Sequence, residues 1–183
     1  MAPDEDLQYP IGKENEQEEY ESDFNEQLKI TLLADIKMLP VALENAIQNL
    51  DADQLETPYR QGGWTVKQLV HHVADSHINA YTRFKLGLTE ETPAIKPYDQ
   101  NAWADLSDTQ KLPINISLTL LHALHSIWYQ VLSDLDEKQW QRSIYHPGSK
   151  TTITLWHLLK SYAWHSRHHT AQIIKLRERM NWY

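Results

Sequence analysis

Hydrophobic residues recur every three or four positions along four segments of this chain, the spacing that places them on one face of an α-helix. These segments cover residues 26–50, 65–86, 114–135 and 154–176. Each is about 20 residues long, enough for four amphipathic helices to pack their apolar faces together. The pattern therefore predicts an all-α protein built as a four-helix bundle.

Residues that favour helix starts stand at two of the predicted boundaries. Thr65 follows Gly62, Gly63 and Trp64 and is a good N-cap for the second helix, and Thr154 is a good N-cap for the fourth. Pro40 lies inside the first segment, where we expect it to kink the helix or to begin a new turn.

Two connections between the predicted helices have features of their own. The loop at residues 89–112 is rich in Thr, Pro and Asp and is longer than a helix connection needs, and loops of this length are often functional. Residues 142–155 predict a short β-hairpin-like turn around the His-Pro-Gly-Ser sequence at 146–149. We therefore expect long connecting loops around the bundle.

The charge is concentrated at the N-terminus. Residues 1–26 hold ten acidic residues and one lysine, a net charge of −9. Since the formal net charge of the whole chain is −8, the remaining residues carry about +1. We expect residues 1–25 to be an irregular, acidic, partly extended and solvated segment with residues 9–12 as an anchor, and residues 26–183 to be a single helical-bundle domain. A near-neutral body has no basic face for a phosphate backbone, so we expect no nucleic-acid partner.

Composition restricts location and metal chemistry. No apolar run reaches the roughly 18 residues that a membrane span needs, and the acidic N-terminus does not resemble a signal peptide. We therefore expect a cytoplasmic protein with no membrane partner. The chain has no cysteine, which excludes disulfides and thiolate ligands, so a bound metal has to be held by imidazole, carboxylate and water.

Three of the ten histidines fall within residues 165–169. On a helix with 100° per residue, His165 and His169 point toward the apolar face, whereas His168 points to the flank or to solvent. Two imidazoles four residues apart can converge on one divalent ion, with nitrogens about 2.0–2.1 Å from it. Two ligands do not complete a site, and hydrogen-bonded core histidines are an alternative interpretation of this pair.

The second predicted helix offers two candidates for a third ligand. His72 borders its apolar face and begins a polar stripe that Ser76, Asn79 and Arg83 continue at helical spacing. His77 lies in the middle of the apolar face. Periodicity allows either histidine, with a preference for His72 because its polar neighbours could line a wet pocket. The stripe fits a solvated edge equally well.

The remaining histidines fit ligand positions poorly, and the common catalytic motifs are missing from the sequence. His122, His125 and His157 fit core or surface positions better than ligand positions, and His146 fits a turn. The sequence HSRHH lacks the Glu of the HExxH zincin motif, the missing cysteines exclude zinc deaminase chemistry, and no GxSxG, P-loop or GxGxxG sequence occurs. A site of three histidines would keep a coordination position for water, the open arrangement that metal catalysis needs.

Long strings of this sequence resemble a known family. They are the YPIG sequence at 9–12, the string TPYRQGGWTVKQLVHHVADSHINAYTRFKLGLTEETPAIKPYDQNAW at 57–103, and YHPGSKTTITLWHLLKSYAWHSRHH at 145–169. Together they are similar to the YfiT-type metal-dependent hydrolases, a group of the DinB-like four-helix bundles. The resemblance covers nearly the whole chain.

This resemblance has implications for the site. It implies that His72, His165 and His169 hold one divalent metal per subunit, Zn2+ or Ni2+, with solvent completing the coordination shell. It thereby favours His72 over His77 as the third ligand. It also implies a cytoplasmic homodimer.

The resemblance implies a hydrolase in which the metal activates a bound water to attack a small electrophilic substrate. Asn79 and Arg83 would orient the substrate or stabilise developing negative charge, and His77 and Asp75 are candidates for a general base. Related DinB-like bundles use low-molecular-weight thiols, so a metal-dependent thiol S-transferase is the first alternative. A helical metal-binding module without turnover is the second, since fold analogy does not establish a reaction.

Overall fold

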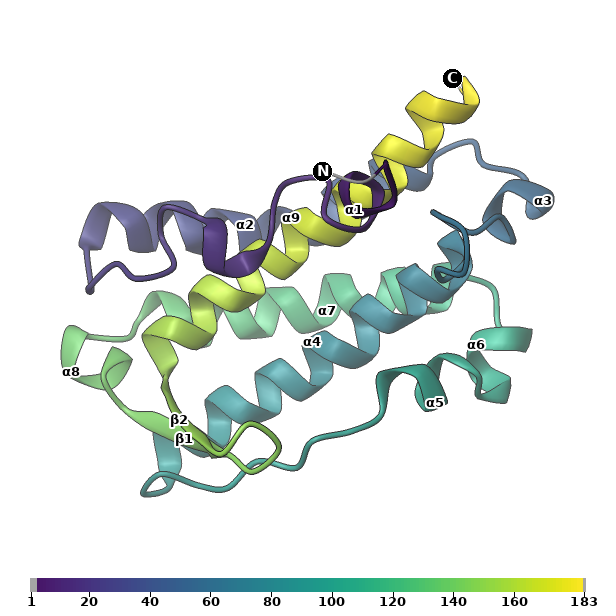
Figure 1. Ribbon diagram of the computed structural model, residues 1–183. Helices are drawn as coiled ribbons and strands as arrows, with labels where there is room; N and C mark the ends of the chain where they lie inside the picture. Colours follow the sequence, from purple (N-terminus) through teal and green to yellow (C-terminus); the bar gives the residue numbers. More distant parts are fainter. Residues whose placement is uncertain (1–2, 183) are drawn as a thin grey trace.

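The computed structural model describes residues 3–182 and contains long helices at the four predicted places (Figure 1). They are α2 (Glu26–Ile47), α4 (Val66–Thr89), α7 (Asn115–Ser133) and α9 (Leu155–Met180). Both α2 and α4 pack against α7 and α9, so α2 and α4 occupy opposite corners of the bundle. The predicted all-α four-helix bundle is confirmed.

The helix starts follow local side-chain chemistry. The side chain of Thr65 accepts a hydrogen bond from the backbone N–H of Gln68, and Thr154 accepts one from His157, so both predicted N-caps are confirmed. Of the two outcomes expected at Pro40, a kink or a new turn, the new turn does not occur, because α2 continues through Pro40 as one helix. Pro40 is buried in α2, where tertiary packing outweighs the lost backbone hydrogen bond.

The apolar core of the bundle is divided into two clusters. One includes Phe84, Trp128 and Trp140, and the other includes Leu43 and Leu121, all of them essentially inaccessible to solvent. Along the helices, a set of mostly buried histidines lies where the two clusters meet and beside that junction, and we call it the histidine layer. Its members are His72 and His77 on α4, His125 on α7, and His165 and His169 on α9.

The connections contain short elements. The predicted hairpin is confirmed as antiparallel strands β1 (Ser143–His146) and β2 (Thr151–Thr154). The loop that follows α4 contains α5 (Gln100–Ala104) and α6 (Ser107–Lys111), and it is attached to the hairpin by two backbone hydrogen bonds between its residues 93 and 95 and Tyr145. The helices α3 (Ala52–Leu55) and α8 (Glu137–Trp140) complete the other connections.

The acidic N-terminal segment lies along α9 and contains α1 (Pro3–Gln8) and the 3-10 turn η1 (Glu14–Glu16) (Figure 1). The indole of Trp164 donates a hydrogen bond to the carbonyl of Gly12 at 3.3 Å, as expected of an anchor at residues 9–12. Residues 5–25 are half-buried or exposed, but this acidic segment is not free, because cations of α9 bind it: Lys160 donates to two of its carbonyls and Arg167 pairs with Glu19.

The boundary between residues 25 and 26 stays a prediction, and residues 1, 2 and 183 of the two predicted units lie outside the described part of the chain. Among residues 3–182, no helix combines the length and the apolar character needed to cross a membrane.

Candidate metal centre

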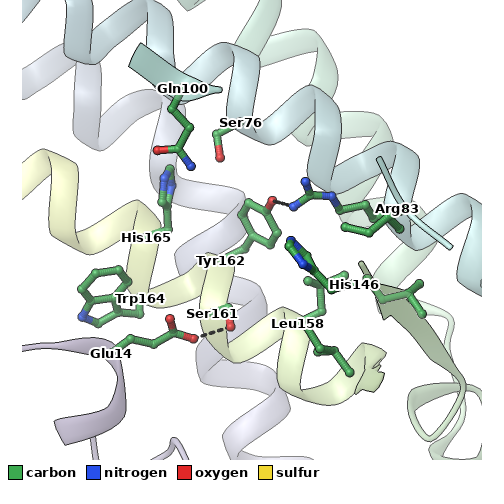
Figure 2. Close-up of a pocket in the computed structure, with 13 residues that line it drawn as sticks. Glu14, Ser76, Arg83, Gln100, His146, Leu158, Ser161, Tyr162, Trp164 and His165 are labelled. Atoms are coloured by element: carbon green, nitrogen blue, oxygen red, sulfur yellow. Dashed lines mark hydrogen bonds between the residues drawn. The ribbon is translucent and has the colours of Figure 1, made fainter. Parts of the chain in front are cut away.

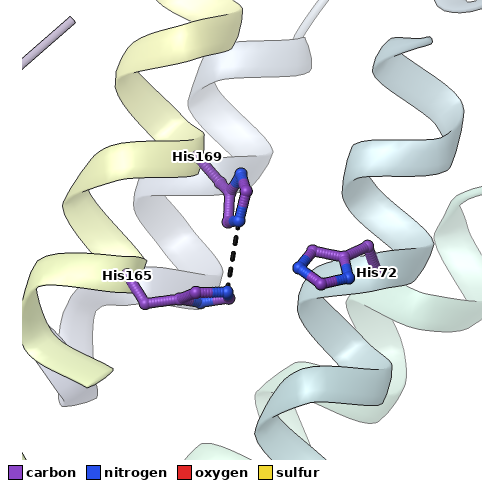
Figure 3. A group of neighbouring side chains, drawn as sticks. All are labelled: His72, His165 and His169. Carbon is purple, nitrogen blue, oxygen red and sulfur yellow. Dashed lines mark hydrogen bonds between the residues drawn. The ribbon is translucent and has the colours of Figure 1, made fainter. Parts of the chain in front are cut away.

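Three histidines from two helices converge in the histidine layer (Figure 3). His72 comes from α4, and His165 and His169 come from successive turns of α9. One ring nitrogen of each lies within 4.8 Å of the corresponding nitrogens of the other two, and the Nε2 atoms of His165 and His169 are 3.2 Å apart. Two nitrogens bound to the same tetrahedral Zn2+ lie roughly 3.4 Å apart, so this spacing fits a metal ion.

The rest of the structure orients these rings. The ring of His72 packs against that of Trp64, with 4.4 Å between their centroids. The Nδ1 atom of His169 lies 2.8 Å from Oε1 of Gln172. Since the amide of Gln172 donates to the carbonyl of Gln8 and to His168, its Oε1 is the acceptor and His169 carries its proton on Nδ1. Nε2 of His169 is then unprotonated and faces the other two ligands.

All three imidazoles are held in the neutral form. Burial lowers the pKa of His72 to about 2 and that of His169 to about 4, and the neighbouring histidines add to the shift of His72. Burial and the surrounding imidazoles also hold the pKa of His165 well below its usual range. Because only unprotonated histidine binds a metal, the chemistry of this set of donors fits a divalent cation.

A cavity of about 200 Å³ opens beside His165 (Figure 2). His72 and His169 are buried, whereas His165 is partly accessible and forms part of the cavity wall, so the cavity borders the centre at this residue. The wall is partly apolar, and its polar residues come from the N-terminal segment, α4, α5, α9 and, through His146, β1 (Figure 2). They include Glu14, Ser76, Arg83, Gln100, Ser161 and Tyr162.

Arg83 and Tyr162 form one of two hydrogen-bonded pairs in the wall of this cavity, and Ser161 and Glu14 form the other (Figure 2). Nη1 of Arg83 donates to the hydroxyl of Tyr162 at 2.9 Å. Burial raises the pKa of Tyr162, although the nearby guanidinium opposes the shift, so the phenol keeps its proton. Its oxygen accepts from Arg83, and its O–H, which has the hydroxyl of Ser76 nearby, is a donor.

The other residues of the predicted site have different surroundings. Asn79 is absent from the cavity wall, and its amide donates to the carbonyl of Asp75 on its own helix. Burial raises the pKa of Asp75 to about 6, but Asp75 is also absent from that wall. Contacts of Asn79 or Asp75 with a substrate therefore stay predictions.

His77 lies behind His165 rather than in the cavity. It is fully buried, and its Nδ1 and Nε2 lie 2.9 and 3.1 Å from nitrogens of His125 and His165. Both nitrogens are thus engaged, which does not fit the pocket role that the sequence suggested for His77.

His168 differs from its prediction. The helical wheel placed it at the flank or toward solvent, but it is buried, and it stacks on Trp164 at 4.4 Å between centroids. The physical reason is the N-terminal segment, which covers this flank of α9 and places Tyr9 beside the His168 ring. Periodicity within one helix does not detect cover supplied by a distant segment.

The sequence reasoning also missed residues that complete the site. Gln172 was not considered, although a Gln three residues after a predicted ligand His was a detectable signal on the same helix face. Glu14, Gln100 and Ser161 reach the cavity from three separate elements, and no local pattern indicates that they meet.

Comparisons with known proteins agree with this architecture. A model of the DinB superfamily matches residues 36–173. The chain is 48% identical to a protein of Bacillus cereus strain AH820 named "Putative metal-dependent hydrolase", over 97% of this chain and 99% of that protein. It is 46% identical to the similarly named YfiT of Bacillus subtilis strain 168, over 96% of this chain and 97% of YfiT. A solved structure of Bacillus subtilis YfiT, described as a probable metal-dependent hydrolase with an unusual four-helix bundle topology, matches with a TM-score of 0.91 over 97% of this chain and 99% of that chain.

Proposed function

The chain belongs to the DinB superfamily, and from that premise we propose that it is a metal-dependent hydrolase whose divalent ion is held by His72, His165 and His169. The observation that carries the proposal is the convergence of three neutral imidazoles next to a cavity. We expect Zn2+ or Ni2+ as the ion. In an open three-histidine site such an ion acts as a Lewis acid and lowers the pKa of a bound water to about 7.

The cavity supplies groups that act on the substrate. We assign to Tyr162 the donation of a hydrogen bond to a substrate oxygen that gains negative charge, because its phenol keeps its proton and its oxygen is already oriented by Arg83. Arg83 stabilises that charge through its hydrogen bond to the hydroxyl of Tyr162. Burial of Tyr162 strengthens both interactions, since charges and dipoles interact more strongly away from water.

The first experiment tests the site. The purified protein is dialysed against Zn2+ or Ni2+ and then against buffer, and its metal content is compared with that of His169→Ala and His168→Ala. His168 is the matched control because it is buried on the same helix one position away. We expect about one equivalent of metal in the wild type and in His168→Ala and a substoichiometric amount in His169→Ala. Full retention in a folded His169→Ala protein would contradict the ligand set.

The second experiment tests the reaction. The loaded protein is assayed against a panel of small esters, amides and lactones, with and without a low-molecular-weight thiol. We expect thiol-independent hydrolysis, lowered about 100-fold in kcat by Tyr162→Phe. If the protein instead conjugated the thiol to the substrate, the proposed reaction would be thiol transfer and not hydrolysis. If the protein bound metal stably but turned over no substrate of the panel, it would be a metal-binding module and not an enzyme of this kind.

A further inference from the structure

A line of histidines extends from the metal centre across the whole bundle. Nδ1 of His165 on α9 lies 3.1 Å from Nε2 of His77 on α4, and Nδ1 of His77 lies 2.9 Å from Nε2 of His125 on α7. Nδ1 of His125 lies 2.5 Å from the backbone carbonyl of Ile36 on α2. We call these three rings and the carbonyl the histidine relay, and it contains one member from each long helix.

The end of the relay determines where every proton lies. The carbonyl of Ile36 can only accept, so His125 carries its proton on Nδ1. A neutral imidazole has one N–H, which makes Nε2 of His125 the acceptor for Nδ1–H of His77. By the same step, Nε2 of His77 accepts from Nδ1–H of His165. Nε2 of His165 therefore has no proton, and it is the nitrogen that faces His169.

The surroundings of the relay favour the neutral form of the imidazole rings of His77 and His125. Both rings are buried, that of His77 fully, and burial lowers the pKa of His125 to about 4. Trp128 packs edge-on against both rings, with centroids 5.5 and 5.6 Å away. A second proton on either ring would place two N–H groups against each other or leave a buried charge without a counterion.

We propose that His77 and His125 are positioning residues, which fix His165 in its Nδ1–H form and so present its Nε2 to the metal. The inference rests on the proposed metal site but concerns residues outside the ligand set. The relay holds protons and does not conduct them, since a backbone carbonyl at its end has no proton to exchange. Hydrogen bonds of this kind orient a ligand ring and raise the basicity of its metal-binding nitrogen.

The first test needs neither metal nor turnover. Long-range 1H–15N spectra of the histidine side chains in the metal-free wild-type protein near pH 7.5 distinguish protonated from unprotonated nitrogens. We expect His125, His77 and His165 all to carry their proton on Nδ1 and none on Nε2. A proton on Nε2 of any of the three would overturn the relay. Because no variant is involved, this test does not depend on the folding of a mutant.

The second test measures metal affinity by competition with a chelator. His77→Phe removes both the acceptor for His165 and the donor to His125, and we expect it to weaken metal binding about 10–100-fold. His77→Gln supplies one acceptor and one donor and should restore most of this affinity. The matched control is His71→Phe, because His71 is buried on the same helix but bonds to Ser117 on α7. Its metal affinity should equal that of the wild type.

The outcomes separate the relay from the proposed function. Wild-type affinity in a folded His77→Phe protein would overturn the relay and leave the three ligands and hydrolysis intact. Absence of hydrolysis with the expected proton positions and the expected loss of affinity would overturn the reaction and leave the relay intact. A purely structural role for His77 would lower the thermal stability of His77→Phe and His71→Phe alike without a selective loss of metal affinity, and this too would overturn the relay.

Discussion

Gln172 supports the metal centre from outside the ligand set, and its replacement tests whether an outer hydrogen bond matters. Gln172→Met keeps the size of the side chain but removes the acceptor for Nδ1–H of His169, at 2.8 Å, and the donor to the carbonyl of Gln8, also at 2.8 Å. A net hydrogen bond contributes about 0.5–1.5 kcal/mol, and loss of a partner that orients a ligand typically lowers metal affinity about 10–100-fold. His169 and His168 are both buried, and each loses its partner on Gln172, at about 1–3 kcal/mol for each buried group left without one; the half-buried Gln8 carbonyl can bond to water instead.

We therefore expect Gln172→Met to bind metal about 10–100-fold more weakly and to unfold with a free energy about 2–6 kcal/mol lower than that of the wild type. Chelator competition measures the first change, and urea unfolding of the metal-free protein measures the second. Gln130→Met is a suitable control, because Gln130 is exposed on α7 and bonds to Asp134. If the folded Gln172→Met protein bound metal as tightly as the control, the reasoning about His169 would be refuted.

Three further predictions address stability and the N-terminal segment. The folded pKa of His125, about 4, lies below its ordinary 6.5, so between these pH values the unfolded chain binds more protons. The unfolding free energy of the metal-free protein should be highest above pH 6.5 and fall as the pH is lowered toward 4; a flat urea-unfolding profile would contradict this. In Gly87→Ala the new Cβ would meet Leu155 Cδ2 at 2.8 Å and Ile144 Cγ2 at 3.1 Å, and we expect this crowding to lower the unfolding free energy by about 1–3 kcal/mol; equal stability in urea would show that the neighbours move freely. Arg167→Gln removes the ion pairs of α9 with the N-terminal segment and with α2, so limited proteolysis near the N-terminus should be faster, and an unchanged rate would count against this attachment.

Local signals predicted the helices well. The 3.6-residue periodicity and the N-caps Thr65 and Thr154 act within a few residues of each other, and the structure follows them. The hairpin was predictable for the same reason, because a Pro-Gly turn separates two short strands.

The site was only partly accessible from the sequence. Periodicity showed that His165 and His169 share a face, but His72 and His77 both lie in the buried part of α4, and a helical wheel does not show which of them meets α9 at the height of the pair. In the structure His72 joins the pair and His77 lies one step behind it. Resemblance to a family resolved what the wheel left open.

Residues placed by distant segments were the hardest to predict. The N-terminal segment covers His168 and contributes Glu14 to the cavity, and these contacts join positions more than 140 residues apart in sequence. Charge composition suggested a solvated segment because it does not show that Arg167 of α9 pairs with Glu19 or that Lys160 of α9 bonds to the carbonyl of Tyr20.

The histidine layer also specifies how the four helices align lengthwise. With apolar clusters on both sides, a slip of α9 by one turn, about 5.4 Å, would press its imidazoles against aliphatic side chains and leave their N–H groups without acceptors. Purely apolar helices tolerate such sliding far better, since one leucine substitutes for another. A polar band in the middle of the bundle therefore selects one register out of several that hydrophobic packing alone would accept.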